Sequence, residues 1–232
     1  MSKECPIKGI AIYTDCLECD NKICNKEKYD KIVIGIDQSY KNVGISIAAD
    51  GKLLKVKSLD LNKIESNSVK RKTLDKTLEK IIGNVILRSD NIVCIIERIR
   101  LRSQGFLNID YIKSIGALNS VIVDKFEGYD IPVYSVDTRF WKSQIVGSSK
   151  PLENPYGIDS KKYRTILYMK SRRLLKYIVE EYNGKGTKGV IQVKINGQKV
   201  PCKVNDDLAD SYCIAMCGYL PKSKQKFKEE KF

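Results

Sequence analysis

The pattern of hydrophobic and polar positions predicts that the folded part of the chain begins with consecutive strands. An apolar run at residues 32–36 ends in Asp37, and a second apolar run extends from Gly44 to Ile47. Asp50 and Gly51 form a turn signal between residues 45–49 and 53–61, as expected for a β-hairpin. We therefore expect three strands joined by short turns.

Helical and strand patterns alternate in the middle of the chain. Apolar residues at helical spacing recur on one face at Leu74, Leu78, Ile81, Ile82 and Val85. Residues 92–96 are wholly apolar and rich in β-branched side chains, which is typical of a buried central strand, and this strand ends at Glu97. A helix at 109–126 and a strand at 133–136 follow. The order predicts an α/β fold with a mixed sheet.

The C-terminal third predicts a helix, a hairpin and a last helix. Residues 160–181 form an amphipathic pattern with seven basic side chains, and we expect one helix there. Asn196 and Gly197 are a strong hairpin signal between residues 190–195 and 198–204. Asn205 is then a suitable N-cap for a helix at 206–220, and residues 222–232 form a basic tail.

Charge and composition restrict the chemistry. The 232 residues include 42 basic and 28 acidic side chains, a net charge of +14, which favours a polyanionic partner such as nucleic acid; the alternative is a solvated lysine-rich surface. Histidine is absent, which excludes Ser-His-Asp and Cys-His catalysis and histidine-containing zinc sites. Hydrolysis would have to use carboxylates, lysines or metal ions.

Residues 1–29 form a cysteine-rich arm. It holds four of the eight cysteines, and two of them have the Cys-x-x-Cys spacing that lets both thiolates reach one ion. The candidate zinc ligands are Cys5, Cys16, Cys19 and Cys24; four free thiols are the alternative. Neither a signal peptide nor an apolar run long enough to span a membrane is recognisable. We expect no membrane association and no secretion.

Three acidic points occupy similar settings. Asp37 and Glu97 each end an apolar strand, and Asp207 and Asp210 lie three residues apart on one face of the predicted last helix. If the two strands are adjacent and parallel, these carboxylates meet at one sheet edge, where their repulsion calls for cations. Mg²⁺ prefers oxygen ligands, so we expect a two-metal site. The alternatives are a turn residue at Asp37, a surface ion pair of Glu97 with Arg98 or Arg100, and a favourable helix dipole contact at residues 206 and 207.

Several motifs together resemble a known family. The segments GIDQS with NVGISI, an apolar strand ending in IIE, and NDDLADSYCIA are similar to those of RuvC-type Holliday junction resolvases of the RNase H-like superfamily, most closely the phage, poxvirus and mitochondrial branches. The resemblance covers roughly residues 31–220. It implies a five-stranded mixed sheet flanked by helices, with the cysteine-rich extension and the β-hairpin added. The corresponding division is an arm at 1–29, a nuclease domain at 30–221 and the tail at 222–232.

The resemblance also implies a function and its residues. It implies a dimeric, Mg²⁺-dependent endonuclease, with Mn²⁺ as a substitute, that resolves four-way junctions by paired nicks. The implied metal ligands and catalytic residues are Asp37, Glu97, Asp207 and Asp210, with Asp206 competing for the place of Asp207. The DNA-binding candidates are Arg98, Arg100, Arg102, Phe106, Lys142, Lys161, Lys162, Arg164, Lys170, Arg172 and Arg173. Such a protein would act in the cytoplasm, at a host-cell nucleoid or at a viral replication site.

The same sequence features are compatible with other functions. A related nuclease for flaps, forks or RNA–DNA hybrids would use the same acids, and only substrate assays separate the two. An actin-like or sugar-kinase ATPase also begins with an Asp on a strand before a glycine-containing hairpin, but it normally needs a longer, duplicated chain. A non-catalytic nucleic-acid-binding module would bind without metal-dependent cleavage.

Overall fold

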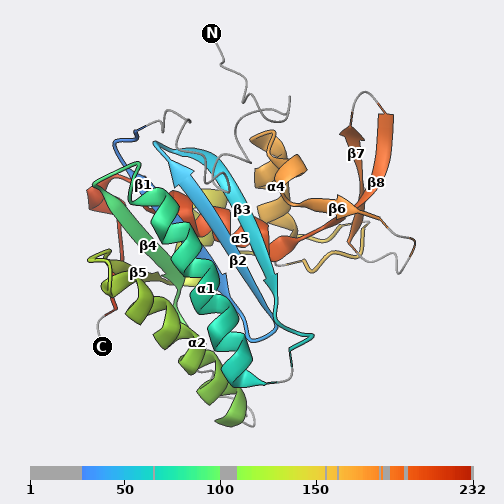
Figure 1. The fold of residues 1–232 in the computed structure, drawn as a ribbon. Helices are drawn as coiled ribbons and strands as arrows, with labels where there is room; N and C mark the ends of the chain where they lie inside the picture. The colour runs from blue at the N-terminus through green and yellow to red at the C-terminus, as the bar shows by residue number, and fades with distance from the viewer. Residues whose placement is uncertain are drawn as a thin grey trace, which may run out of the picture.

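A six-stranded mixed sheet forms the centre of the fold (Figure 1). The computed structural model describes residues 28–64, 66–99, 109–154, 156–160, 162–182, 184, 189–195 and 198–230. The sheet has the order β3-β2-β1-β4-β5-β9. Its strands are β1 (Ile32–Gln38), β2 (Asn42–Ala49), β3 (Lys52–Asp60), β4 (Ile92–Glu97), β5 (Val133–Val136) and β9 (Lys228–Glu229).

The first three strands form the predicted antiparallel meander. β1 pairs with β2 and β2 pairs with β3, both antiparallel. Asp50 and Gly51 take positive φ angles of 47° and 77° at the turn between β2 and β3, the backbone conformation that a tight hairpin requires. β1 then pairs in parallel with β4, and β4 pairs in parallel with β5. The C-terminal ends of these three strands therefore lie at one edge of the sheet.

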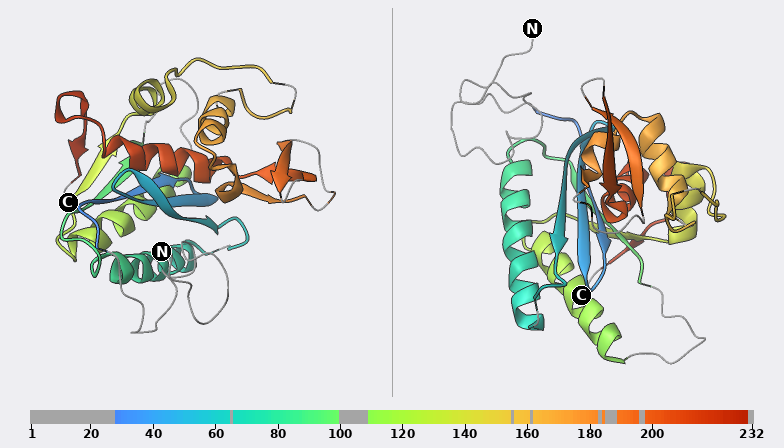
Figure 2. Two further views of the ribbon diagram at one scale, coloured as in Figure 1. Left: turned by 90° about the horizontal axis from the view of Figure 1, so that it is seen from above. Right: turned by 90° about the vertical axis from the view of Figure 1, so that its right-hand side faces the viewer.

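Helices cover both faces of the sheet (Figure 2). The even-numbered side chains of β1, such as Ile34, belong to a core shared with Leu78 of α1 (Asn67–Val85) and Phe126 of α2 (Ile109–Glu127). The odd-numbered Val33 belongs to a second core with Ile214 of α5 (Asp206–Cys217). Alternation along a central strand thus serves two helical layers, which explains why β1 and β4 are almost continuously apolar.

The sixth strand corrects the expected five-stranded sheet. β9 comes from the C-terminal segment that the charge pattern identifies as a tail, and it pairs antiparallel with β5. Phe227, next to β9, packs against Tyr134 with ring centroids 5.8 Å apart. In the sequence, one aromatic residue within a basic segment is too weak a pattern to predict a strand.

The prediction of a single helix at residues 160–181 is wrong. α4 (Tyr163–Ser171) ends where Arg173 takes a φ of 60°, and the N–H of Leu174 donates to the Met169 carbonyl oxygen at 2.9 Å. The turn η2 (Leu175–Tyr177) and strand β6 (Val179–Glu181) follow. Pairing of β6 with another strand satisfies backbone groups that a longer helix would satisfy internally, so tertiary structure overrides the helical periodicity.

β6 belongs to a small second sheet. Its order is β6-β8-β7, with β7 (Val190–Ile195) and β8 (Gln198–Val204) paired antiparallel. The two strands have the predicted bounds, and the turn residues 196–197 between them lie outside the described residues. Ile191, Val193 and Cys202 form a small core of this sheet. In Figure 1 the sheet projects beside α4, away from the main sheet.

Two further points concern the expectations from sequence. The cysteine-rich arm, with Cys5, Cys16, Cys19 and Cys24, lies outside the described residues, so the zinc hypothesis stays a prediction. No helix in the described ranges is both long and apolar enough to cross a lipid bilayer.

Candidate active site

Two of the four candidate carboxylates lie at the ends of adjacent parallel strands. Asp37 belongs to β1 and Glu97 to β4, and the register pairs Ile36 with Ile96, the residues directly before them. Parallel pairing with this register brings Asp37 and Glu97 to the same edge of the sheet, which meets the condition that the sequence set for a shared carboxylate site. The repulsion between them appears in the pKa of Asp37, described below.

Close packing of α5 against the sheet brings the other two carboxylates to this edge. A Cβ atom on Gly44 would lie 2.2 Å from the Asp207 carbonyl oxygen, and one on Gly35 would lie 2.2 Å from the Ser211 carbonyl oxygen. The helix can therefore rest on β1 and β2 only because both positions are glycine. Ser46 and Ser211 hydroxyls form a hydrogen bond of 2.6 Å across the same contact.

The start of α5 is fixed by a local cap. The Asn205 side chain oxygen accepts a hydrogen bond from the N–H of Leu208 at 3.2 Å, as the sequence predicted. The helix thus begins at Asp206, and Asp207 and Asp210 follow on neighbouring positions of one face. Asp210 is buried, with 5% of its surface exposed, whereas Asp207 is partly exposed.

The four carboxylates interact strongly. Burial raises the pKa of Asp37 well above its ordinary value, and the charges of Asp210, Glu97 and Asp207 raise it further, while Lys162 lowers it. Burial likewise raises the pKa of Asp210 to about 7, against the lowering influence of Lys142 and Lys162. Without a cation, this site is therefore electrostatically unfavourable when fully ionised.

Glu97 is held by two donors that the sequence analysis missed. The Thr138 hydroxyl donates to Oε1 at 2.6 Å and the Trp141 indole N–H donates to Oε2 at 3.0 Å. Both belong to α3 (Thr138–Trp141), the short helix capped by Asp137 directly after β5. The only tryptophan of the sequence, directly before the candidate Lys142, was the available signal. These bonds orient Glu97 toward the sheet edge.

Lys162 supplies positive charge inside the site. Its ammonium forms an ion pair with Asp206 and lies 3.4 Å from Oδ1 of Asp207. Burial lowers the pKa of Lys162, but the neighbouring acids, Asp206 first, outweigh this and raise the pKa above its ordinary value. The sequence analysis placed Lys162 on a DNA-binding helix face; the structure instead directs it at the carboxylates.

The contacts distinguish Asp206 from Asp207. Asp207 is among the charges that raise the pKa of Asp37, and Asp206 is not. Burial raises the pKa of Asp207 itself, while Lys162 and a hydrogen bond from the Asn42 side chain lower it. Asp207 is therefore the member of the pair that belongs to the carboxylate group, and Asp206 acts as the partner of Lys162.

The donor set fits a hard divalent cation. Oδ1 of Asp210 is buried and has no hydrogen-bond partner among the described residues; the Thr165 hydroxyl lies close enough to lower the pKa of Asp210, but without hydrogen-bonding geometry. An orphaned buried carboxylate oxygen among other carboxylates suits a metal that prefers oxygen ligands. As the side chains stand, no three described His, Cys, Asp or Glu residues lie at ligand spacing, so binding would require side-chain movement.

The other predicted DNA-binding residues lie in different places. Arg98 donates to the Ser135 hydroxyl at 3.3 Å, and the Lys142 ammonium lies 4.9 Å from the ring centroid of Trp141, whose indole donates to Glu97. Arg164 donates to the Lys150 carbonyl oxygen at 2.8 Å, whereas Lys170 is exposed. Arg172 lies over the Tyr168 ring, and Arg173 is an exposed residue with a positive φ just after the end of α4. The remaining candidates, Arg100, Arg102, Phe106 and Lys161, lie outside the described residues.

Comparisons with known proteins support the fold. Neither a family model nor a curated protein sequence matches the chain. Among solved structures, Thermus thermophilus RuvC matches with a TM-score of 0.54 at 15% identity, over 86% of this chain and 99% of that chain. T. thermophilus RuvC in complex with a Holliday junction substrate gives 0.53 at 13% identity, with the same coverage. The yeast mitochondrial Holliday junction resolvase Ydc2 gives 0.43 at 15% identity, over 83% and 79% of the two chains.

The two matches to T. thermophilus RuvC support the resemblance at the level of the fold alone. The chain has the α/β architecture of RuvC, with a mixed sheet flanked by helices, as expected for an RNase H-like fold. Identity below one sixth carries no residue roles from one chain to the other.

Proposed function

We propose that the chain is a divalent-metal-dependent endonuclease that cuts branched DNA, with four-way junctions as its substrate. The observation that carries this proposal is the meeting of Asp37, Glu97, Asp207 and Asp210 at one sheet edge, from three elements far apart in sequence. The shared fold with RuvC, which has been captured with a Holliday junction substrate, and the net charge of +14 agree with it.

The proposed ligands for Mg²⁺ are these four carboxylates. When bound, two Mg²⁺ ions would neutralise the carboxylates, favour formation of the attacking hydroxide and stabilise charge on the leaving oxygen. In the hydrolysis, the water oxygen bonds to phosphorus and the bond to the 3′ oxygen breaks, which leaves a 5′ phosphate and a 3′ hydroxyl.

The chain's own residues hold this site in place. Thr138 and Trp141 fix both oxygens of Glu97, which limits its rotation and reduces the cost of ordering it. The packing of α5 against Gly44 keeps Asp207 beside β2. Lys162 balances the acids, and the neighbouring Lys142 lies on the same side of the sheet edge, where it is suited to contact a backbone phosphate.

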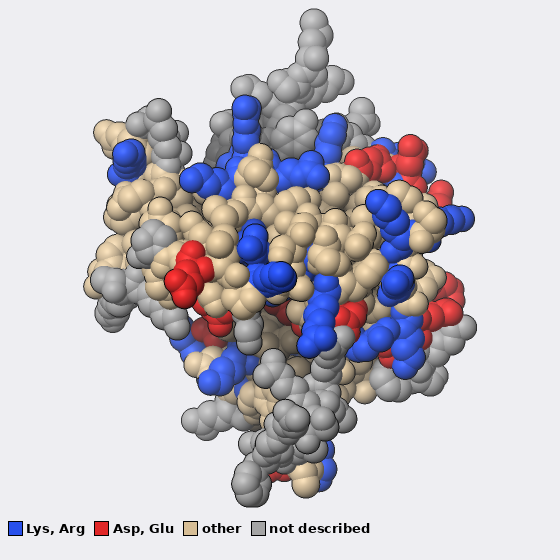
Figure 3. Space-filling view, turned by 180° about the vertical axis from the view of Figure 1, so that it is seen from behind, with Lys and Arg blue, Asp and Glu red and all other residues tan. Residues whose placement is uncertain are grey.

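The surface on this side of the molecule suits a polyanion. Figure 3 shows the side of α4 and α5, on which Lys and Arg side chains are spread with acidic side chains visible between them. Such a distribution attracts DNA phosphates in a manner that weakens with salt.

Paired nicks in a symmetric junction would need two active sites, so we propose a homodimer.

Cleavage of a labelled synthetic four-way junction tests the proposal. Wild type, Asp210→Asn and the control Asp90→Asn are compared in Mg²⁺ and in EDTA. Asp90 is exposed and precedes β4, at the opposite edge of the sheet, so its replacement makes the same change of charge away from the site. We expect paired nicks from wild type and Asp90→Asn in Mg²⁺ only, and none from Asp210→Asn.

The other outcomes separate the alternatives. Metal-dependent cleavage of flaps or hybrids in preference to junctions would retain the carboxylate site and change the substrate. Junction binding by wild type without cleavage of any substrate would contradict an enzymatic function and favour a binding module. A monomer at the concentration of the cleavage assay would contradict the homodimer.

A further inference from the structure

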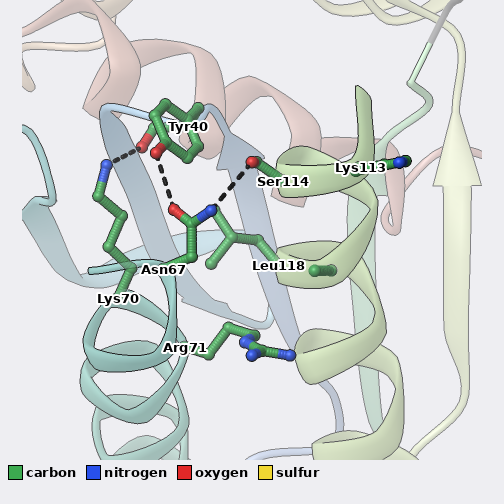
Figure 4. A pocket seen from close by; sticks show the side chains of 8 residues that line it. Tyr40, Asn67, Lys70, Arg71, Lys113, Ser114 and Leu118 are labelled. Carbon is green, nitrogen blue, oxygen red and sulfur yellow. Dashed lines mark hydrogen bonds between the residues drawn. The ribbon is translucent and has the colours of Figure 1, made fainter. Parts of the chain in front are cut away.

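A pocket of about 160 Å³ lies between the N-terminal halves of α1 and α2, on the face of the sheet opposite the carboxylates (Figure 4). It is lined by Tyr40, Asn67, Lys70, Arg71, Lys113, Ser114, Ala117 and Leu118. Three of these side chains are basic and none is acidic. The composition suits an anion with several oxygen acceptors.

The polar wall of this pocket is already ordered. The Tyr40 hydroxyl donates to Oδ1 of Asn67 at 2.7 Å, and the Asn67 side-chain amide donates to the Ser114 hydroxyl at 3.3 Å. One asparagine thus links the β1–β2 turn, the start of α1 and α2, as the dashed lines in Figure 4 show. A preformed wall lowers the conformational entropy lost when a ligand binds.

Lys70 is the observation that points to an anion. Only 4% of its surface is exposed, yet its ammonium has no carboxylate partner in the described part of the chain. It lies 3.6 Å from the Tyr40 ring centroid and 3.5 Å from the Tyr40 carbonyl oxygen, a long hydrogen bond. Burying a charged group is costly unless an opposite charge meets it, and a ligand anion would provide that charge.

The other two cations are available. Arg71 and Lys113 are exposed and make no ion pair or hydrogen bond with any described residue. Figure 4 shows the Arg71 guanidinium directed from α1 toward α2, whereas Lys113 extends outward from α2. Arg71 can therefore meet an anion inside the pocket, and Lys113 can meet a neighbouring one. The start of α1 adds the positive end of a 19-residue helix.

The position of the pocket relates it to the carboxylates. Tyr40 follows Asp37 by three residues, in the turn between β1 and β2, and Asn42 at the other end of this turn contacts Asp207. Gln38, which lies between Asp37 and Tyr40 in the sequence, donates to the Glu97 carbonyl oxygen and to the Asn119 side-chain oxygen of α2. A polyanionic chain that crosses this sheet edge can reach both the carboxylates and the pocket.

We propose that this pocket is a phosphate subsite that binds the DNA backbone a few nucleotides from the cleaved bond. The inference rests on the proposed function for its ligand, but it predicts a property of binding alone. It assigns Tyr40, Asn67, Lys70 and Arg71 to substrate positioning, at a distance from the chemical step.

Charge reversal at adjacent helix positions tests the subsite. Arg71→Glu is compared with Lys72→Glu, which makes the same charge change at an exposed position that does not line the pocket. Junction binding is measured in EDTA over a range of salt concentrations. We expect Arg71→Glu to weaken binding roughly tenfold or more and to reduce the slope of log K against log salt by about 0.9, the loss of one phosphate contact. Lys72→Glu should have a smaller effect on both.

The outcomes remain distinct from those of the cleavage test. Equal effects of Arg71→Glu and Lys72→Glu, in folded proteins, would overturn the subsite even if the wild type cuts junctions. A specific Arg71 effect on binding would support it even if no cleavage occurs. Inorganic phosphate is the second probe: if it raises the thermal midpoint of wild type but not of Arg71→Glu, while both bind DNA alike, the pocket takes a free anion and the proposal fails. Lys70→Met, which keeps the buried stem, should reproduce the Arg71→Glu binding defect.

Discussion

Asp210→Asn should stabilise the metal-free protein at alkaline pH, although it removes a proposed catalytic residue. Asp210 is buried beside other carboxylates, and its pKa is raised from the ordinary value of 3.8 to about 7. The native state therefore binds a proton more tightly than the unfolded state. Between these two pKa values the native protein holds the proton and the unfolded chain does not, so the free energy of unfolding falls as pH rises.

The size of the effect follows from the same pKa values. The interval from 3.8 to about 7 corresponds to roughly 4 kcal/mol at 1.36 kcal/mol per pKa unit. Ionisation of Asp210 above pH 7 therefore lowers the free energy of unfolding by this amount. Asparagine avoids this cost, but it buries an amide whose donors lack assured partners, at about 1–3 kcal/mol. We expect a net gain of about 1–3 kcal/mol at pH 8 in EDTA, and a net loss of about 1–3 kcal/mol at pH 4, where the Asp210 carboxyl of wild type is protonated.

Urea unfolding in EDTA, followed by circular dichroism and by the fluorescence of Trp141, measures this difference. Trp141 is the sole tryptophan and is buried beside Glu97, so its emission reports on the site. Asp90→Asn serves as the control and should change stability little at either pH. An Asp210→Asn protein that is less stable than wild type at pH 8, or a difference that does not depend on pH, would refute the electrostatic reasoning.

Three further predictions concern the same site. Gly44→Ala should lower the free energy of unfolding by about 1–3 kcal/mol and the cleavage rate by about 100-fold, because its Cβ would lie 2.2 Å from the Asp207 carbonyl oxygen. Gly83→Ala, where a Cβ has open space in α1, should leave cleavage unchanged and raise the free energy of unfolding by up to about 1 kcal/mol. Equal behaviour of the two variants in urea unfolding and junction cleavage would contradict the packing argument. Mn²⁺ titration should change the emission of Trp141, whose indole donates to Glu97, and a response that survives unchanged in Asp210→Asn would count against a shared metal site. Lys162→Gln should lower the midpoint of thermal unfolding of the metal-free protein at pH 8, since Lys162 lowers the pKa of Asp37 and Asp207, and Mg²⁺ should restore most of that midpoint. An unaltered midpoint in EDTA would argue against this role of Lys162.

Local sequence determined most of the secondary structure. The strand at 133–136, the paired strands at 190–195 and 198–204, and the Asn205 cap have the bounds that their patterns predict. Alternation, turn residues and caps act within a few residues, and the backbone hydrogen bonds they favour are local or between neighbouring segments. The acidic residues at strand ends also identified the candidate site, because an acid after a buried strand needs a partner.

Tertiary structure decided which of these elements meet. Nothing local shows that β1 lies parallel to β4, or that Gly44 contacts Asp207 more than 160 residues away. The predicted basic helix at 160–181 is interrupted because β6 pairs with β8, and Lys162 faces Asp206 and Asp207 because α4 packs near α5. Likewise Trp141 became part of the site only when α3 placed it beside Glu97. Sequence periodicity fixes the direction in which side chains point from an element, whereas the neighbour that they reach depends on long-range packing and charge balance, which no local window contains.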